Sequence, residues 1–205
     1  MKKRIIKALL VLLFLAVLHL GAYAFFIGLP FWDFTESTAP ATYITEVNGA
    51  IPAQTGYQCA AYASAFTMRY FNQIIDPIES YETFKGKMSD GTILPRGVVS
   101  YFKDQGLDVH YYKGSFEQLK THISDGIPVI VFIKVDVSQP YLHYVPVVGY
   151  DETYVYLAES LPNRINVWDK PYNRRVPIET FMTLWDIGSL KMPYHSFTYF
   201  VVSSK

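Results

Sequence analysis

The chain has 205 residues, half of them apolar, and its 18 lysines and arginines balance 18 aspartates and glutamates. This length and composition allow one ordinary domain with a well-packed core once the N-terminus is set aside. The balanced charge shows no basic stripe of the kind that binds nucleic acid, so we expect no nucleic-acid partner. The single cysteine excludes an internal disulfide and metal sites built on paired cysteines, and we expect no metal or cofactor.

Residues 1–32 are predicted to be a signal peptide or membrane anchor. A basic start precedes an apolar run from Ala8 to about Leu29, and about 20 apolar residues are enough to cross a bilayer as a helix. Two alternatives stay open. The small-x-small sequence Ala22-Tyr23-Ala24 is typical of a cleavage site, whereas the apolar residues that continue beyond it favour an uncleaved anchor, with Phe31 and Trp32 at the outer interface. Either way the remainder lies outside the cytoplasm, on the cell membrane as a single-pass protein or secreted.

The next segment, 33–49, is interpreted as a linker, because it is rich in Thr, Ser and Pro and has weak periodicity. Residues 50–205 are predicted to form the domain, whose first half is mainly helical. Ser115 suits a helix N-cap, and Gly126 suits the position just after that helix. The predicted helices of this half cover 58–75, a short stretch from Pro77, 95–105 and 115–124, with a strand at 107–112.

The second half changes to strand patterns. The predicted strands cover 127–135, 143–150, 154–159 and 196–203, and a helix is predicted over 176–185. The short turn at 151–153 makes the second and third of these strands a hairpin. Pro146 cannot donate to a ladder, so its strand requires an unpaired edge position or a bulge. Helices first and antiparallel strands later predict an α+β fold.

Cys59 is the candidate nucleophile. It stands where a polar loop becomes helical, and the reactive thiolate is favoured at a helix N-terminus or beside a protonated imidazole. Of five histidines, His143 is best placed to supply that imidazole, because it opens a buried strand. Glu159 closes the next strand of the hairpin, so we expect it near His143, holding the other ring nitrogen. Gln54, in the loop before Cys59, is a candidate hydrogen-bond donor to a developing oxyanion, together with the Cys59 backbone N–H.

These residues resemble those of a known family. Gln54-x4-Cys59, the stretch LHYVPVVGYDETYVYLAES and the stretch VPIETFMTLW are similar to the C39-like cysteine peptidases, a papain-like group related to bacteriocin-processing peptidase domains. The resemblance covers about residues 50–203. It implies a papain-like fold in which Cys59 is the nucleophile, His143 the general base and then acid, and Gln54 the oxyanion donor.

The chain departs from the family pattern at two places. Ala60 replaces the Gly that commonly follows the cysteine, and Glu159-Ser160 replaces the expected Asp-Pro. Glu is one methylene longer than Asp, and Asp169 is the alternative candidate for orienting the histidine. The resemblance extends only to the peptidase part, so it does not imply the double-glycine leader substrates of the bacteriocin-processing members.

Several functions stay open at this point. The first is a thiol hydrolase that cleaves peptide bonds of a secreted peptide or a cell-wall crosslink, and an amidase or acyl transferase of the same fold differs only in substrate and acceptor. The second is a catalytically inactive C39-like binding domain at the cell surface, motivated by Glu159-Ser160. The third, a purely structural surface protein, requires Cys59 and His143 to lie far apart. The other histidines (His19, His110, His122 and His195) are given no catalytic role, and no oligomeric state is predicted.

Overall fold

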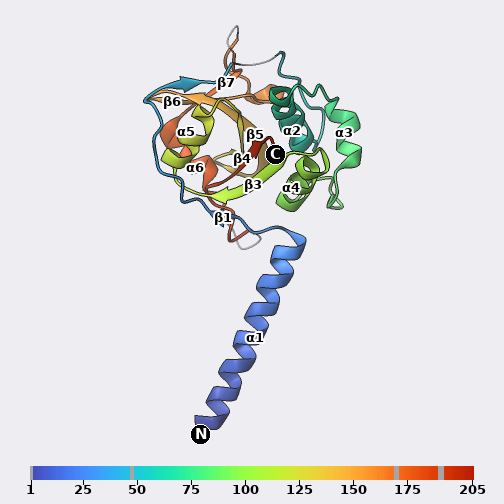
Figure 1. The fold of residues 1–205 in the computed structure, drawn as a ribbon, viewed down its shortest axis with the longest axis vertical. Coiled ribbons are helices and arrows are strands. Elements are labelled where there is room, and N and C mark those ends of the chain that lie inside the picture. The colour runs from blue at the N-terminus through green and yellow to red at the C-terminus, as the bar shows by residue number, and fades with distance from the viewer. Residues whose placement is uncertain (1, 47–48, 169–170, 189–191) are drawn as a thin grey trace.

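The computed structural model of the protein describes residues 2–46, 49–168, 171–188 and 192–205. A long helix, α1 (Lys2–Phe26), projects from a domain of helices around one mixed sheet (Figure 1). The strand order is β1-β3-β8-β4-β5-β6-β7, with β2 beside β5, and β1 pairs parallel to β3. The strands are β1 (Phe31–Trp32), β2 (Tyr43–Ile44), β3 (Asp108–Lys113), β4 (Val129–Asp136), β5 (Gln139–Tyr150), β6 (Tyr154–Leu157), β7 (Arg174–Pro177) and β8 (Thr198–Ser203). The predicted α+β fold is confirmed.

The helices cover both faces of this sheet. They are α2 (Cys59–Met68), α3 (Pro77–Thr83), α4 (Pro95–Asp104), α5 (Phe116–Ser124) and α6 (Ile178–Trp185). Along β4, Ile130 and Phe132 join a core with α2 and α4, whereas Val129, Val131 and Ile133 join a second core with α5 and α6. Because both faces are buried, the strand is a continuous apolar run rather than an alternating one.

Local sequence signals explain several element boundaries. The Ser115 side chain and Gln118 form a reciprocal capping box at the start of α5, and Gly126 follows that helix with a φ of 92°. The helix predicted over 58–75 is shorter than expected. It ends at Met68, and a 3-10 turn then stops at Asn72, whose left-handed backbone a helix cannot continue.

Two strand predictions need correction. The strand predicted from His143 starts earlier, at Gln139, because it pairs with the far end of β4 in a long hairpin, so His143 lies within β5 rather than at its start. β7 was not predicted, since its four residues contain little β-branched sequence. The expected irregularity near Pro146 is present: the β5–β6 register shifts between Val147 and Gly149.

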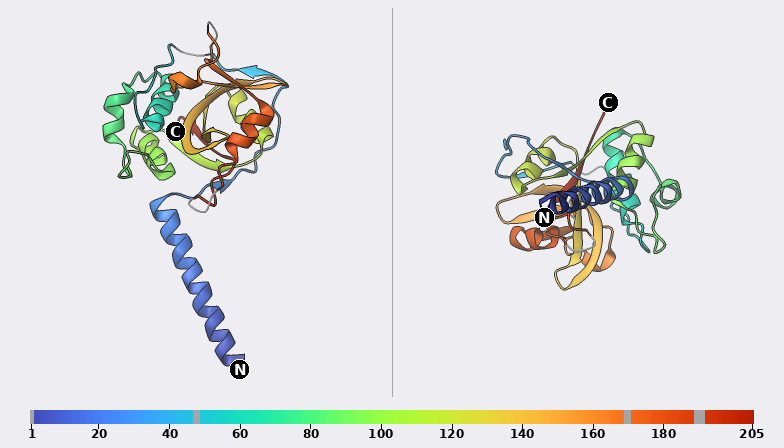
Figure 2. Two further views of the ribbon diagram at one scale, coloured as in Figure 1. Left: turned by 180° about the vertical axis from the view of Figure 1, so that it is seen from behind. Right: turned by 90° about the horizontal axis from the view of Figure 1, so that it is seen from below.

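The segment predicted as a linker runs along the domain. Within it β2 lies beside β5, and β1, which comes just before it, lies beside β3. Figure 2 shows this blue stretch following the outside of the domain. Asp33 is buried, and its Oδ2 accepts a hydrogen bond from Tyr199 and lies 2.8 Å from His122 Nε2. These contacts hold the segment against the domain, so it does not separate the domain from α1. The boundaries at 32 and 49 stay predictions.

Candidate active site

Cys59 and His143 are brought together by the packing of α2 on β5. Cys59 is the first residue of α2, and the small side chains of Ala60, Ala61 and Ala63 let this helix approach the sheet closely. A small residue after the cysteine is therefore needed for packing, and Ala60 meets that need at 1% exposure.

The His143 ring is buried between Cys59 and Glu159. Its Nε2 lies 2.8 Å from Glu159 Oε1, and the Cys59 side chain lies close enough to the ring to raise its pKa. Because Nε2 faces the carboxylate, Nδ1 is the nitrogen left for the thiol. His143 and Glu159 are almost fully buried, whereas Cys59 is partly exposed, so Cys59 is the residue of the three that is open to solvent.

The electrostatics of this site favour an ion pair. Burial lowers the pKa of His143, but the charge of Glu159 and the hydrogen bonds to Cys59 and Glu159 outweigh it and raise that pKa from 6.5 to about 9. Burial likewise raises the pKa of Glu159, but His143, Arg174 and the Leu161 N–H together hold it well below its usual range. At neutral pH the arrangement is therefore an imidazolium beside a carboxylate.

Glu159 is held by several neighbours. Arg174 Nη1 donates to Glu159 Oε2 at 2.8 Å, and the Leu161 N–H donates to Oε1 at 2.7 Å. The Asn173 side-chain amide pairs with the Glu159 backbone on both sides, accepting from its N–H and donating to its carbonyl, each at 2.7 Å. These contacts hold the glutamate side chain, which is longer than an aspartate side chain, in one position.

The sequence reasoning missed Arg174 and Asn173. Both belong to the unpredicted β7 region, and Arg174 itself is buried. A buried carboxylate needs more compensation than one imidazole supplies. This requirement, together with the Arg174-Arg175 pair that follows Glu159 in the sequence, is the signal that could have pointed to Arg174.

Gln54 is tied to the residue that follows Glu159. Its Oε1 accepts a hydrogen bond from Ser160 Oγ at 2.6 Å, and its backbone N–H donates to the Ser160 carbonyl at 2.8 Å. Its Nε2 donates to the Gly56 carbonyl at 2.6 Å, which leaves one amide hydrogen for another acceptor. Ser160, which stands in place of the family proline, thus positions the amide. Asp169 lies outside the described residues.

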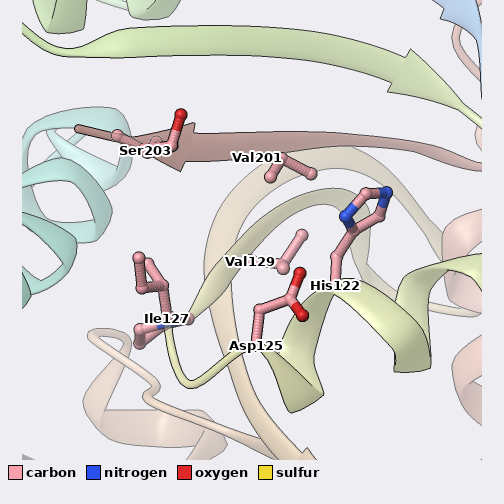
Figure 3. A pocket seen from close by; sticks show the side chains of 8 residues that line it. His122, Asp125, Ile127, Val129, Val201 and Ser203 are labelled. Atoms are coloured by element: carbon pink, nitrogen blue, oxygen red, sulfur yellow. The ribbon is translucent and has the colours of Figure 1, made fainter. Parts of the chain in front are cut away.

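The pocket in Figure 3 lies away from these residues. It has a volume of about 90 Å³, and its walls come from the end of α5, the start of β4 and the end of β8. Ligand pockets commonly measure about 300–1,000 Å³. Half of its labelled lining is aliphatic and half consists of the polar residues His122, Asp125 and Ser203, and neither Cys59, His143 nor Glu159 lines it. Neither its size nor its place suits a peptide substrate of Cys59.

The comparisons with known proteins agree with this fold. Residues 43–189 match the model of the Peptidase_C39 like family. The peptidase domain of Streptococcus ComA, a bi-functional ABC transporter, is 15% identical over 75% of this chain and 97% of its own, with a TM-score of 0.58. A double glycine motif protease from an AMS/PCAT transporter, in complex with the leader peptide, is 16% identical over 82% of this chain and 99% of its own, with a TM-score of 0.54.

A plant enzyme shares the fold as well. The Carica candamarcensis cysteine protease CMS1MS2, in complex with E-64, is 11% identical over 81% of this chain and 99% of its own, with a TM-score of 0.55. At such identities the likeness shows the fold alone, which is the predicted papain-like one. No curated protein sequence matches the chain.

Proposed function

Because the chain belongs to the Peptidase_C39 like family, we propose that it is a cysteine hydrolase that cleaves peptide or other amide bonds. The observation that carries the proposal is the buried His143 ring, which lies 2.8 Å from Glu159 and close to Cys59, at the start of the helix that packs on its strand. A thiol beside an imidazolium is activated as a nucleophile. The same arrangement argues against a purely structural protein, in which these two residues would have no reason to meet.

The proposed reaction follows from this arrangement. The Cys59 thiolate attacks the amide carbonyl carbon, and a C–S bond forms while the oxygen gains charge. The free hydrogen of the Gln54 amide and the Cys59 backbone N–H stabilise that oxygen. His143 donates its proton to the leaving amine as the C–N bond breaks, which leaves an acyl-enzyme.

Water completes the cycle. It attacks the acyl carbon and gives one proton to His143, the C–S bond breaks, and the carboxylic acid leaves. This step restores the thiolate and the imidazolium. Glu159 keeps the imidazole oriented and Arg174 holds Glu159, so both act as positioning residues.

We place the site outside the cytoplasm on a membrane anchor. α1 is long and apolar enough to span a bilayer, and its most apolar stretch is unburied. Tyr23, in the middle of the candidate cleavage sequence, is buried against the domain, with its ring centroid 5.2 Å from that of Tyr194 and 5.7 Å from that of His195. Cleavage at this sequence would separate Tyr23 from those partners, which favours the anchor over the signal peptide. The substrate is then a secreted peptide or a cell-wall peptide.

The pH dependence of Cys59 alkylation tests this proposal. The thiol is the only one in the chain, so iodoacetamide labelling of the full chain in detergent reports on one site. We expect fast alkylation well below ~8.5, where free thiols titrate, and we expect His143→Ala to abolish it. His122→Ala is the matched control, because it removes a histidine from another carboxylate.

Two outcomes would change the proposal. An inert Cys59, or one that titrates like a free thiol in all three proteins, contradicts the hydrolase and supports the inactive binding domain. A reactive Cys59 whose chain transfers acyl groups to an amine but does not hydrolyse peptides would assign the acyl transferase. Circular dichroism of each variant confirms that a loss of reactivity does not come from unfolding.

A further inference from the structure

The end of α1 is docked on the domain. Tyr23 is the one residue of that helix that is buried, and it packs on Tyr194 and His195. The Arg96 N–H, at the start of α4, donates to the Ile27 carbonyl at 2.9 Å. A Cβ on Gly28 would lie 3.1 Å from Arg96 N, and its φ of 94° suits glycine alone. The chain therefore enters the domain along a fixed path.

Large aromatic side chains remain exposed around this junction. We call them the aromatic collar, and each is between 61% and 89% exposed: Phe25, Phe26, Phe31, Trp32 and Phe34. The backbone that carries the last three is held in place, since β1 pairs with β3 and Asp33 is buried between Trp32 and Phe34. Side chains of this size contribute most when removed from water, so a fixed cluster of them in solvent indicates a partner.

Cations accompany the collar. The Arg96 guanidinium lies 4.3 Å from the centroid of the Phe25 ring, and the Lys113 ammonium lies 5.3 Å from that of Trp32. Aromatic rings beside basic groups are the combination that suits lipid headgroups at a membrane interface. The first exposed acidic residue after the collar is Glu36, two residues beyond Phe34, and the combination of aromatic and basic residues ends there.

The length of α1 places the collar at the membrane surface. From Ala8, the first residue after the basic start, to Phe26 there are 19 residues, which as a helix measure about 28 Å. The hydrocarbon core of a bilayer is about 30 Å thick. With the basic residues on the cytoplasmic side, the collar therefore reaches the outer interface.

We propose that the aromatic collar inserts into the outer lipid interface and holds the domain in one orientation on the membrane. This inference rests on the anchoring part of the proposed function. It also orients the domain. Arg174, which binds Glu159, begins β7, and β7 lies at the end of the domain remote from α1 (Figure 1). The β7 end of the domain then faces away from the bilayer.

Tryptophan fluorescence can test this orientation, because the chain has tryptophans at both ends. Trp168 is 71% exposed, and the stretch that precedes it, at Asn166 and Val167, is bonded to the Asn173 carbonyl next to β7. Trp168→Phe leaves Trp32 as the exposed tryptophan, and Trp32→Phe leaves Trp168. Trp185 is fully buried and gives both variants the same background.

The full chain is placed in vesicles of phosphatidylcholine and phosphatidylglycerol, with or without lipid brominated near the headgroup end of its acyl chains. We expect the brominated lipid to quench most of the Trp32 emission in Trp168→Phe and almost none of the Trp168 emission in Trp32→Phe. Adding Phe31→Ser and Phe34→Ser to Trp168→Phe should reduce the quenching of Trp32, since both side chains are exposed and their loss leaves the core intact.

Other outcomes overturn the inference. The intact mass shows whether the protein retains α1. If α1 is retained and brominated lipid does not quench Trp32, then α1 anchors the protein but the aromatic collar does not contact the lipid. A Trp32 emission that is blue-shifted yet insensitive to brominated lipid assigns the collar to a protein partner. A mass that lacks α1 contradicts the anchor and the inference together. Cys59 alkylation is read separately, so none of these results bears on the chemistry.

Discussion

The domain contains two histidine–carboxylate pairs with the same short contact. His143 Nε2 lies 2.8 Å from Glu159 Oε1, and His122 Nε2 lies 2.8 Å from Asp33 Oδ2. Their third partners differ. The ring of His143 meets the thiol of Cys59, whereas the carboxylate of Asp33 is shared with the hydroxyl of Tyr199.

This difference shows what makes such a pair functional. The His122 pair joins the segment after α1 to α5 and the sheet, so its role is to fix one part of the chain on another. The His143 pair places a protonated ring beside Cys59, the nucleophile that we propose. A buried imidazole and carboxylate are therefore common to a structural clamp and to the proposed catalytic site, and the group on the far side of the ring distinguishes them.

Replacing each histidine with alanine should give the largest difference in activity between the proposed catalytic pair and the structural pair. We expect His143→Ala to lower kcat/KM for peptide cleavage by about 10²–10⁴, the usual contribution of a general acid–base. We expect His122→Ala to leave kcat/KM unchanged while lowering the midpoint of thermal unfolding. Steady-state kinetics and calorimetry on both variants measure this contrast. Equal loss of activity in the two would remove the distinction.

Matched amide variants of the two carboxylates should give the next largest effect. Glu159→Gln removes the charge that raises the pKa of His143 to about 9, so the alkaline limb that we expect to follow this pKa should move to lower pH. Breaking a buried pair also costs about 3 kcal/mol or more of unfolding free energy. Asp33→Asn should leave the alkaline limb in place.

Both carboxylates have lowered pKa values, so both contributions to stability are lost in acid, but only the His143–Glu159 pair should also lose its contribution as pH rises. The folded-state pKa of His143 is raised from 6.5 to about 9, so its contribution is fully present below 6.5 and is lost as pH rises through 9. Hydrogen bonds from Thr35, Tyr199 and His122 lower the pKa of Asp33 despite its burial. That contribution is present above its ordinary pKa and is lost as pH falls. Urea unfolding at several pH values compares Glu159→Gln with Asp33→Asn, and identical pH dependence would contradict the assignment.

The smallest effect concerns the residue after Glu159. Ser160→Ala removes the 2.6 Å hydrogen bond to Gln54, which is worth about 0.5–1.5 kcal/mol. We expect kcat/KM to fall by roughly two- to tenfold with no shift in either pH limb, because the amide loses its orientation while the ion pair stays intact. Ser124→Ala, which removes the 2.8 Å hydrogen bond from the Ser124 hydroxyl to the Thr121 carbonyl in α5, is the control. A shifted pH limb would show that Ser160 acts through the histidine.

Local patterns were sufficient to predict much of this arrangement. The β-branched runs predicted the central strands, and the hairpin at 151–153 predicted that His143 and Glu159 are neighbours, as the 2.8 Å contact confirms. The roles of these residues stay predictions. The sequence could not predict Arg174 on the short strand β7, nor the meeting of Asp33 with His122, which are 89 positions apart. Such contacts depend on how distant segments pack, and no periodicity encodes them.

The fixed contact between α1 and the domain determines which peptides near the membrane can arrive at the site. A domain of this size is roughly 40 Å across, and β7, which carries Arg174, lies at its end remote from α1 (Figure 1). An enzyme on a flexible tether samples a range of heights, but one held upright works at a single height above the lipid. A peptide attached to the same leaflet would need up to roughly ten extended residues before its scissile bond to span the whole domain. Distance from the membrane would then select substrates before any side chain is recognised.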